Sequence, residues 1–352
     1  MKDFSKIKEK GVADCAPEKE PLKILELFGG IGAPRRALSI AGYKIKSIDY
    51  VEVLPYAVLA YNHIFDCGYD PQDIRIWNMN PDIVVHGSPC QDWSNEGKND
   101  VNTGRSILYE RTLQILDPHP ASGDRVLPSA PNVVLWENVP GLLYRHKEHL
   151  DSYIETMNGY GYETKYAVLS ASDYNIPQDR PRLYTVSVMK SDTPFKFPDP
   201  VKPTWQLKQF IDTSVDFDAY PLSEAEKEIF FEKDGRLYVR EATKTGYKEV
   251  KEWQVVNVAF PNSKTRRGRV GDVAKTITTS PRQAVYYNGR LRLLTAKEYM
   301  RLMGYRDRDY DKMVRAGITD RQISALAGNS ICVPVLVQIF KELAACGAMR
   351  KP

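Results

Sequence analysis

LKILELFGGIGAPRRALSIAG, residues 22–42, decides the fold, because an apolar strand-like run, a glycine-rich turn and a helix-like stretch follow one another. Glycines at 29, 30 and 32 let the backbone approach a ligand and place the start of the helix beside it. A dinucleotide fingerprint counted from Gly30 needs glycine at position 35, where Arg35 stands. The turn therefore predicts a ligand site that is not for NAD, with a plain tight loop as the alternative.

The alternation of strand-like and helix-like stretches continues to Met189. The strand-like runs are KILELF, KIKSIDYVE, DIVVHG, NVVLWENV, TKYAVLSA and RLYTVSVM, and the helix-like stretches are ALSIAG, YAVLAYNHI and LDSYIETMNGYG. Near-continuous apolar strands indicate burial on both faces, so we expect an α/β fold with a mostly parallel sheet.

Beyond Met189 the sequence pattern changes. A Pro-rich linker, DTPFKFPDPVKPTW, leads into a Lys/Glu-rich region without clear period, and LTAKEYMRLMGY and QISALAGNSICVPVLVQIFKELAACG return to helical spacing. The predicted division is a charged tail at 1–20, a ligand-binding domain at 21–193, a second domain at 194–305, and C-terminal helices at 306–352 that return to the first domain.

Bulk properties narrow the class of protein. With 352 residues, 42% hydrophobic and 27% charged, the chain can bury a sizeable core. No run approaches the apolar length needed to cross a bilayer and the charged N-terminus lacks the apolar core of a secretory signal, so we expect a cytoplasmic protein. The five cysteines are far apart and none lies at zinc-ligand spacing, which predicts no structural metal. The net charge of +4 permits nucleic-acid binding without requiring it.

PDIVVHGSPCQDWSNEGK, residues 81–98, runs from a strand directly into Ser-Pro-Cys-Gln. A single cysteine is most often core filler. Cys90, however, follows a proline and precedes the polar Gln91 and Ser94, at the strand end where open α/β sheets bind ligands. A thiol there becomes a nucleophile when a neighbouring group favours the thiolate.

The next strand ends in Glu137 and Asn138. Partial burial beside Trp136 and Val139 would raise the pKa of Glu137, so that it can donate a proton near pH 7. A thiol and a proton-donating acid together predict covalent catalysis. The alternative for Glu137 is a capping or salt-bridged carboxylate.

Three further residues fit a sulfonium nucleotide cofactor. Phe28 offers an aromatic wall to a positive centre, Glu52 ends the second strand where an acid accepts hydrogen bonds from ribose hydroxyls, and Asp73 can accept from an adenine amino group. Each acid alone would more often be a solvated loop charge.

With these motifs in order, the sequence resembles the cytosine-specific DNA methyltransferases that modify carbon 5 of the base, from Leu22 to Leu343. The resemblance implies a Rossmann-like methyltransferase fold, S-adenosyl-L-methionine as cofactor, S-adenosyl-L-homocysteine as product, double-stranded DNA as substrate and no metal. The cofactor residues it implies are Phe28, Gly30, Gly32, Glu52, Val53, Asp73, Ile74, Pro89, Asn329 and Ser330. The catalytic residues are Cys90, Glu137, Arg180 and Arg182, and DNA contacts fall on Gln91 and Ser94.

Some positions depart from the family pattern. Ser88 stands where phenylalanine is common before Pro-Cys, and Gly29 replaces the commoner alanine, but neither change removes a group that the reaction needs. NTGRSILYE resembles the fifth motif of the family only loosely, so Ser106 and Leu108 are weaker candidates for cofactor contact.

The resemblance also implies the mechanism. Cys90 attacks carbon 6 of a cytosine turned out of the duplex, Glu137 protonates ring nitrogen 3, and carbon 5 then takes the methyl group. Sequence recognition is expected in the second domain, whose segment PNSKTRRGRVGD concentrates basic residues suited to phosphates and groove edges. These residues are Lys264, Arg266, Arg267 and Arg269.

Three other functions compete with this prediction. A zinc deaminase requires a second cysteine at position 93, where Trp93 stands. The same chemistry on transfer RNA, or a catalytically silent DNA-binding relative, stays open. We expect the protein to be a monomer. The resemblance implies an enzyme of a restriction-modification system or of a phage, and it allows a cognate restriction endonuclease as partner.

Overall fold

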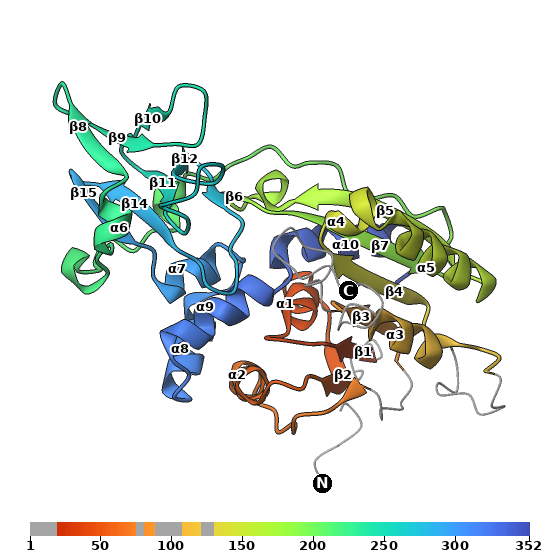
Figure 1. Cartoon of the computed structure of the whole chain (residues 1–352). Coiled ribbons are helices and arrows are strands. Elements are labelled where there is room, and N and C mark those ends of the chain that lie inside the picture. The colour runs from red at the N-terminus through yellow and green to blue at the C-terminus, as the bar shows by residue number, and fades with distance from the viewer. Residues whose placement is uncertain (1–19, 75–80, 89–107, 121–129) are drawn as a thin grey trace, which may run out of the picture.

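A six-stranded sheet forms the centre of the larger lobe (Figure 1). The computed structural model describes residues 20–74, 81–88, 108–120 and 130–352. In spatial order the strands are β2 (Ile45–Val51), β1 (Leu22–Leu27), β3 (Ile83–His86), β4 (Val133–Asn138), β7 (Pro181–Val188) and β5 (Glu163–Ser170). The first four pair in parallel, and β7 runs antiparallel to both of its neighbours. All six predicted strands are present, in a mostly parallel sheet.

Alternate residues of these strands point into two hydrophobic clusters on opposite faces of the sheet. On β3, Ile83 and Val85 join the first cluster and Val84 joins the second. Helices α1 (Ala33–Ile40), α2 (Pro55–Phe65) and α10 (Val333–Ala345) cover the first, and α3 (Tyr109–Leu116), α4 (Gly141–Arg145) and α5 (Lys147–Gly159) cover the second. Burial on both faces explains why the central strands β1, β3 and β4 are mostly apolar.

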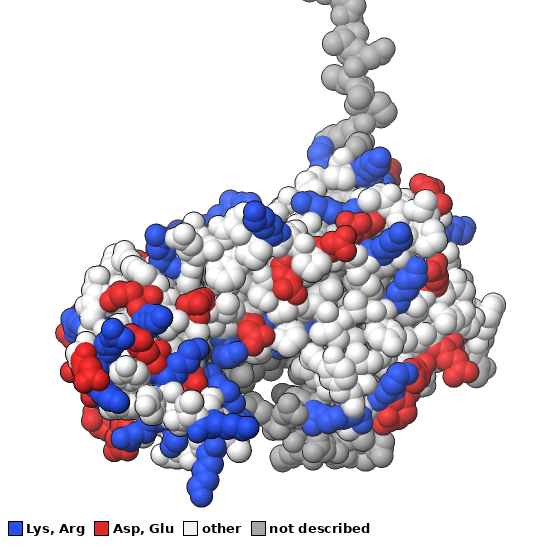
Figure 2. Space-filling model, turned by 90° about the horizontal axis from the view of Figure 1, so that it is seen from above, with Lys and Arg blue, Asp and Glu red and all other residues white. Residues whose placement is uncertain are grey.

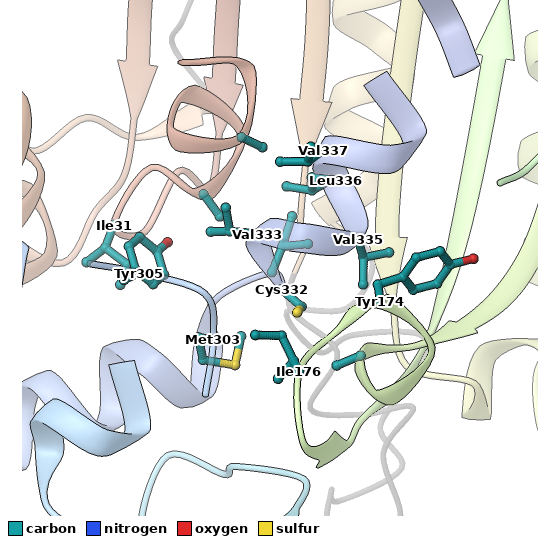
Figure 3. Close-up of a cluster of buried hydrophobic side chains, with 14 of the residues drawn as sticks. Ile31, Tyr174, Ile176, Met303, Tyr305, Cys332, Val333, Val335, Leu336 and Val337 are labelled. Carbon is teal, nitrogen blue, oxygen red and sulfur yellow. The ribbon is translucent and has the colours of Figure 1, made fainter. Parts of the chain in front are cut away.

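The C-terminal helix completes the first cluster. Val333, Val335 and Leu336 of α10 lie between Ile31, which is part of the glycine turn, and Tyr174 on the far side (Figure 3). The preceding helix α9 (Asp320–Asn329) ends before α10 begins, so the predicted long helical stretch consists of two helices.

One expectation about membranes does not hold. Among the described residues, Asp320–Ala345 is long and apolar enough to cross a bilayer by length and composition, although the sequence analysis expected no such run. Of its apolar window, 72% is buried inside the structure, and the core helices of soluble proteins pass the same test.

Two antiparallel sheets build the smaller lobe (residues 230–293), with a hydrophobic cluster of their own. One contains β8 (Phe230–Lys233), β9 (Arg236–Arg240) and β10 (Tyr247–Glu249), and the other β12 (Arg269–Gly271), β11 (Gln254–Asn257), β14 (Gln283–Tyr287) and β15 (Arg290–Leu293). Two hairpins turn through pairs with positive φ, Asp234–Gly235 and Asn288–Gly289. Such Asp-Gly and Asn-Gly pairs are typical of two-residue hairpin turns.

The two lobes share one small sheet. β13 (Ala274–Lys275) pairs in parallel with β6 (Gln178–Asp179) of the larger lobe. Helices α7 (Ala296–Arg301) and α8 (Asp307–Arg315) lead back to α9. The remaining short helices are η3 (Ala171–Tyr174), η4 (Leu207–Gln209), η5 (Phe217–Ala219) and α6 (Glu224–Lys227).

Candidate active site

A pocket opens at the carboxyl ends of the parallel strands. Its walls come from the end of β1 and the glycine turn, the ends of β3 and β4, and the link between α9 and α10. The lining residues are Glu26, Leu27, Phe28, Gly29, Gly30, Ile31, Ala33, Pro34, Val85, Gly87, Glu137, Asn329, Ser330 and Ile331. Four predicted cofactor residues and the predicted catalytic acid therefore share one cavity, although they are up to 302 positions apart in the chain.

The glycine turn adopts backbone conformations that favour glycine. Gly30 and Gly32 have φ of +50° and +70°, and Phe28 is a non-glycine residue at +54°. A side chain added at Gly30 would meet no atom within 4 Å, so this residue leaves space open on the pocket side. Helix α1 begins immediately after Gly32, which directs its first backbone N–H groups towards the turn.

Glu52 is fixed beside the same turn. Its Oε2 accepts a hydrogen bond from the Gly30 N–H at 3.1 Å, and its Oε1 accepts from the Val53 and Leu54 N–H groups at 2.9 and 3.0 Å. Val53 is 62% exposed. One oxygen of Glu52, with a single described donor, retains capacity for a ligand hydroxyl.

The segment with Asp73 and Ile74 is held next to Glu52. The N–H of Gln72 donates to the backbone oxygen of Glu52 at 2.8 Å, and its side-chain amide donates to Asp49 at 2.9 Å. Ile74 is buried and Asp73 is half-buried. Glu52, Val53, Asp73 and Ile74 flank the pocket without lining it.

Glu137, at the end of β4, combines burial with a cation. The Nε of Arg182 lies 3.2 Å from its Oε1, and both side chains are largely buried. Burial raises the pKa of the Glu137 carboxyl, while Arg182 and Arg180 act in the opposite direction. Glu137 is therefore paired with Arg182, and burial raises the pKa of its carboxyl against the effect of that cation.

Arg180 lies next to this pair but binds backbone groups. Its guanidinium donates to the carbonyl oxygens of Ile277, Gly328 and Ser330, each at 2.8 Å, and burial lowers its pKa to about 10. Ile277 follows β13 and Gly328 lies in α9, so Arg180 joins the small shared sheet to the pocket wall.

The predicted nucleophile lies outside the described residues, as do Pro89, Gln91, Ser94 and Ser106. The described chain reaches Ser88, whose Oγ accepts a hydrogen bond from Trp136 Nε1 at 2.8 Å. An added Cβ at Gly87 would lie 3.9 Å from Oε2 of Glu137. The chain therefore passes the acid two residues before Pro89-Cys90 begins.

The predicted DNA-contact residues lie in the smaller lobe before and within β12. Lys264, Arg266 and Arg269 are exposed and Arg267 is half-buried. The guanidinium of Arg266 lies 3.9 Å from the centroid of the Phe260 ring, a cation–π contact that holds it at the surface. Lys and Arg side chains gather on the smaller lobe beside the hollow between the two lobes (Figure 2).

The sequence analysis missed two residues at the pocket. Glu26 lines the cavity, and burial raises its pKa to about 7 despite a hydrogen bond from Tyr61 and the nearby Arg35. Tyr50 donates a hydrogen bond to the Gly30 carbonyl at 2.6 Å. An acid in the otherwise apolar run KILELF was a signal for Glu26, whereas Tyr50 resembled ordinary core.

Comparison with known proteins agrees with this architecture. The type II methyltransferase M.MspI of Moraxella sp is 27% identical over 331 residues, covering 91% of this chain and 70% of the relative. M.NlaX of Neisseria lactamica is 27% identical, with coverages of 92% and 96%, and the orphan methyltransferase M.SPBetaI of Bacillus phage SPbeta is 24% identical, with 92% and 97%.

Solved structures show the same fold. The Dnmt2 methyltransferase of S. pombe superposes with a TM-score of 0.68 at 18% identity, covering 92% of this chain and 98% of its own. The Entamoeba histolytica methyltransferase EhMeth gives 0.64 at 18% identity, covering 93% and 99%. The expected Rossmann-like methyltransferase fold is confirmed.

The family model of the C-5 cytosine-specific DNA methylases matches residues 22–345, and so includes every wall of the pocket and the whole smaller lobe. A match over this length assigns both the fold and the class of enzyme. The chain belongs to the C-5 cytosine-specific DNA methylase family and is a DNA (cytosine-5-)-methyltransferase by class.

Proposed function

We propose that this protein methylates carbon 5 of a cytosine turned out of a specific site in duplex DNA, through a transient bond between Cys90 and carbon 6. The observation that carries the proposal is Glu137, a buried acid with a raised pKa, in the wall of the cavity formed by the glycine turn. The proposed reaction needs a proton donor for the base and a cofactor-binding turn in the same cavity.

The protein residues act on the base in a defined order. The Cys90 thiolate adds to carbon 6 as Glu137 gives its proton to ring nitrogen 3, which makes carbon 5 nucleophilic. When bound, S-adenosylmethionine supplies the electrophilic methyl group. The carbon-5 proton is then lost to solvent as the bond between carbon 6 and Cys90 breaks, and ring nitrogen 3 returns its proton to Glu137, which leaves 5-methylcytosine and the free thiolate. Arg182 holds the Glu137 carboxyl in place at 3.2 Å.

The residues around the pocket fit this cofactor. Gly30 leaves the pocket side open, Phe28 presents an aromatic ring for a sulfonium, and Glu52 keeps acceptor capacity for ribose hydroxyls. The remaining proposed cofactor residues are Gly32, Val53, Asp73, Ile74, Pro89, Asn329 and Ser330.

DNA binding is proposed for the smaller lobe and the segment after the nucleophile. Lys264, Arg266 and Arg269 are exposed cations on one stretch of the smaller lobe, suited to phosphates and guanine edges. We assign base and backbone contacts to these residues, to Arg267, and to Gln91 and Ser94. Turning the base out costs roughly a few kcal/mol, which these contacts must offset.

For the domain organisation we propose the boundaries predicted from the sequence. We propose that residues 21–193 and 306–352 perform catalysis and that residues 194–305 recognise the site, in a monomer located in the cytoplasm. Relatives named type II methyltransferases support a partner restriction endonuclease, and relatives named orphan methyltransferases support action without one.

Bisulfite sequencing of plasmid DNA from cells that express the protein tests activity, base and site together. We expect protected cytosines at one short sequence, and none with Cys90→Ala. Purified protein is assayed in parallel on duplex DNA and transfer RNA with labelled cofactor, and methylation of RNA alone would refute the DNA assignment. A duplex with 5-fluorocytosine at the site should trap a denaturation-resistant adduct, because fluorine cannot leave as a cation.

A further inference from the structure

Two tyrosine rings form a floor beneath the glycine turn, and we propose that Tyr50 is a positioning residue that sets how far this turn reaches into the cofactor pocket. The inference rests on the proposed function, since it concerns the same pocket. Tyr50 belongs to β2 and Tyr61 to α2, and both are fully buried. Their rings stack with centroids 3.8 Å apart; these two rings are the aromatic floor.

The glycines of the turn face different surroundings. A Cβ at Gly29 would lie 2.5 Å from the Tyr50 ring, and one at Gly32 would lie 2.6 Å from the Tyr61 ring. A Cβ at Gly30 would meet nothing within 4 Å. Close approach of the aromatic floor therefore requires glycine at 29 and 32, whereas Gly30 is the glycine that faces the ligand.

The turn is also hydrogen-bonded to the end of β2. The Tyr50 hydroxyl donates to the Gly30 carbonyl at 2.6 Å, and the Gly30 N–H donates to Glu52 at 3.1 Å. The Gly29 N–H donates to the backbone oxygen of Val51 at 3.1 Å. Side chains from one strand end therefore fix both peptide groups of Gly30, and with them its left-handed conformation.

The floor is held more firmly than the turn. The Tyr61 hydroxyl donates to the buried carboxylate of Glu26, and the Arg35 guanidinium donates to that hydroxyl at 3.2 Å. The turn, by contrast, borders open space at Gly30. An atom added between turn and floor will therefore push the turn into the pocket and leave the ring where it is. Cofactor affinity, rather than DNA affinity, should register the change.

Calorimetric titration with S-adenosylhomocysteine measures the effect. Tyr50→Phe removes only the hydroxyl, and the loss of one buried hydrogen bond predicts about fivefold weaker binding. Gly29→Ala inserts a methyl group against the ring and should weaken binding by about tenfold or more. Tyr50→Val removes the ring with a residue that suits a strand, so Gly29→Ala/Tyr50→Val should bind more tightly than Gly29→Ala alone.

Matched variants separate positioning from general damage. Gly30→Ala should also lose affinity, but Tyr50→Val should not restore it, because no ring atom is near that Cβ. Tyr166→Phe, at a 39% exposed tyrosine of β5, should bind normally. For Tyr50→Phe the single-turnover rate at saturating cofactor and the affinity for duplex DNA should stay within about twofold of the parent, and thermal unfolding reports whether each variant folds.

The outcomes are distinguishable. Normal affinity in Tyr50→Phe, or equal losses in Gly29→Ala with and without Tyr50→Val, overturns the positioning role while leaving the pocket intact. If Gly30→Ala also binds normally, the cofactor site itself is misplaced. Should Tyr50→Val fail to fold, Tyr50→Phe and Gly29→Ala still decide the question, since both keep the ring in place.

Discussion

The buried carboxyl of Glu26 should make the stability of the fold depend on pH. Burial raises its pKa from 4.5 to about 7. The folded state holds this proton more tightly than the unfolded chain does. The contribution of the protonated Glu26 carboxyl to the free energy of unfolding is therefore fully present below pH 4.5 and is lost as pH rises through 7. At about 1.36 kcal/mol per pKa unit, Glu26 lowers the free energy of unfolding by about 2 kcal/mol between pH 5.5 and 8.

His86 acts in the opposite direction. Burial lowers its pKa from 6.5 to about 3. The contribution of neutral His86 to the free energy of unfolding is therefore fully present above pH 6.5 and is lost as pH falls towards 3. Over the same interval, from pH 5.5 to 8, His86 raises the free energy of unfolding by about 1.4 kcal/mol. In the parent protein the two contributions largely offset each other.

Glu26→Gln separates the two groups, because an amide keeps the shape and cannot ionise. Its oxygen can still accept the Arg35 N–H, which donates to Glu26 at 3.3 Å. Urea unfolding followed by fluorescence should show the variant gaining about 1.4 kcal/mol from pH 5.5 to 8 while the parent does not. Glu232→Gln, at an exposed site in β8, is the control. Parallel pH curves for Glu26→Gln and the parent would refute the reasoning.

Four further changes test the site. Glu137→Gln should slow single-turnover methyl transfer by about a hundredfold or more while cofactor binding persists, and a normal rate would exclude it as the acid. Arg182→Gln removes a charge that lowers the Glu137 pKa, so the fall in rate at rising pH should move to higher pH; an unmoved profile contradicts the ion pair. Ser88→Ala removes the 2.8 Å hydrogen bond from the Trp136 indole N–H to Ser88 Oγ and should lower the free energy of unfolding in urea by about 1–3 kcal/mol; an unchanged free energy would mean that this bond does not stabilise the fold. Arg180→Lys cannot bind three carbonyls in one plane, so limited proteolysis should cut it faster than the parent.

The central strands of the larger lobe, β1, β3 and β4, were predictable because each is a short, mostly apolar run that is almost entirely buried. The smaller lobe was not, since its strands are short, and those of the sheet β8, β9 and β10 are mostly half-buried or exposed and show no period. Asp234–Gly235 and Asn288–Gly289 were the available turn signals. The antiparallel position of β7 between β4 and β5 depends on contacts between distant segments, which local patterns do not contain.

At the site, chemistry-bearing residues were easier to predict than the residues that position them. Glu137 and the glycine turn could be chosen from residue type and place at strand ends, and both line the pocket. Tyr50 could not, because a tyrosine in a strand looks like core until its distance to Gly29 is known. The role of Cys90 stays a prediction, since it lies outside the described residues.

The guanidinium of Arg180 has a thermodynamic consequence. It bonds to Ser330 in the cofactor pocket wall and to Ile277 beside the strand shared with the smaller lobe. If the smaller lobe contacts DNA as proposed, a ligand that orders the pocket wall should therefore also restrain the DNA-binding lobe. Such coupling between two binding equilibria is reciprocal. The factor by which bound cofactor increases the affinity for DNA therefore equals the factor by which bound DNA increases the affinity for cofactor.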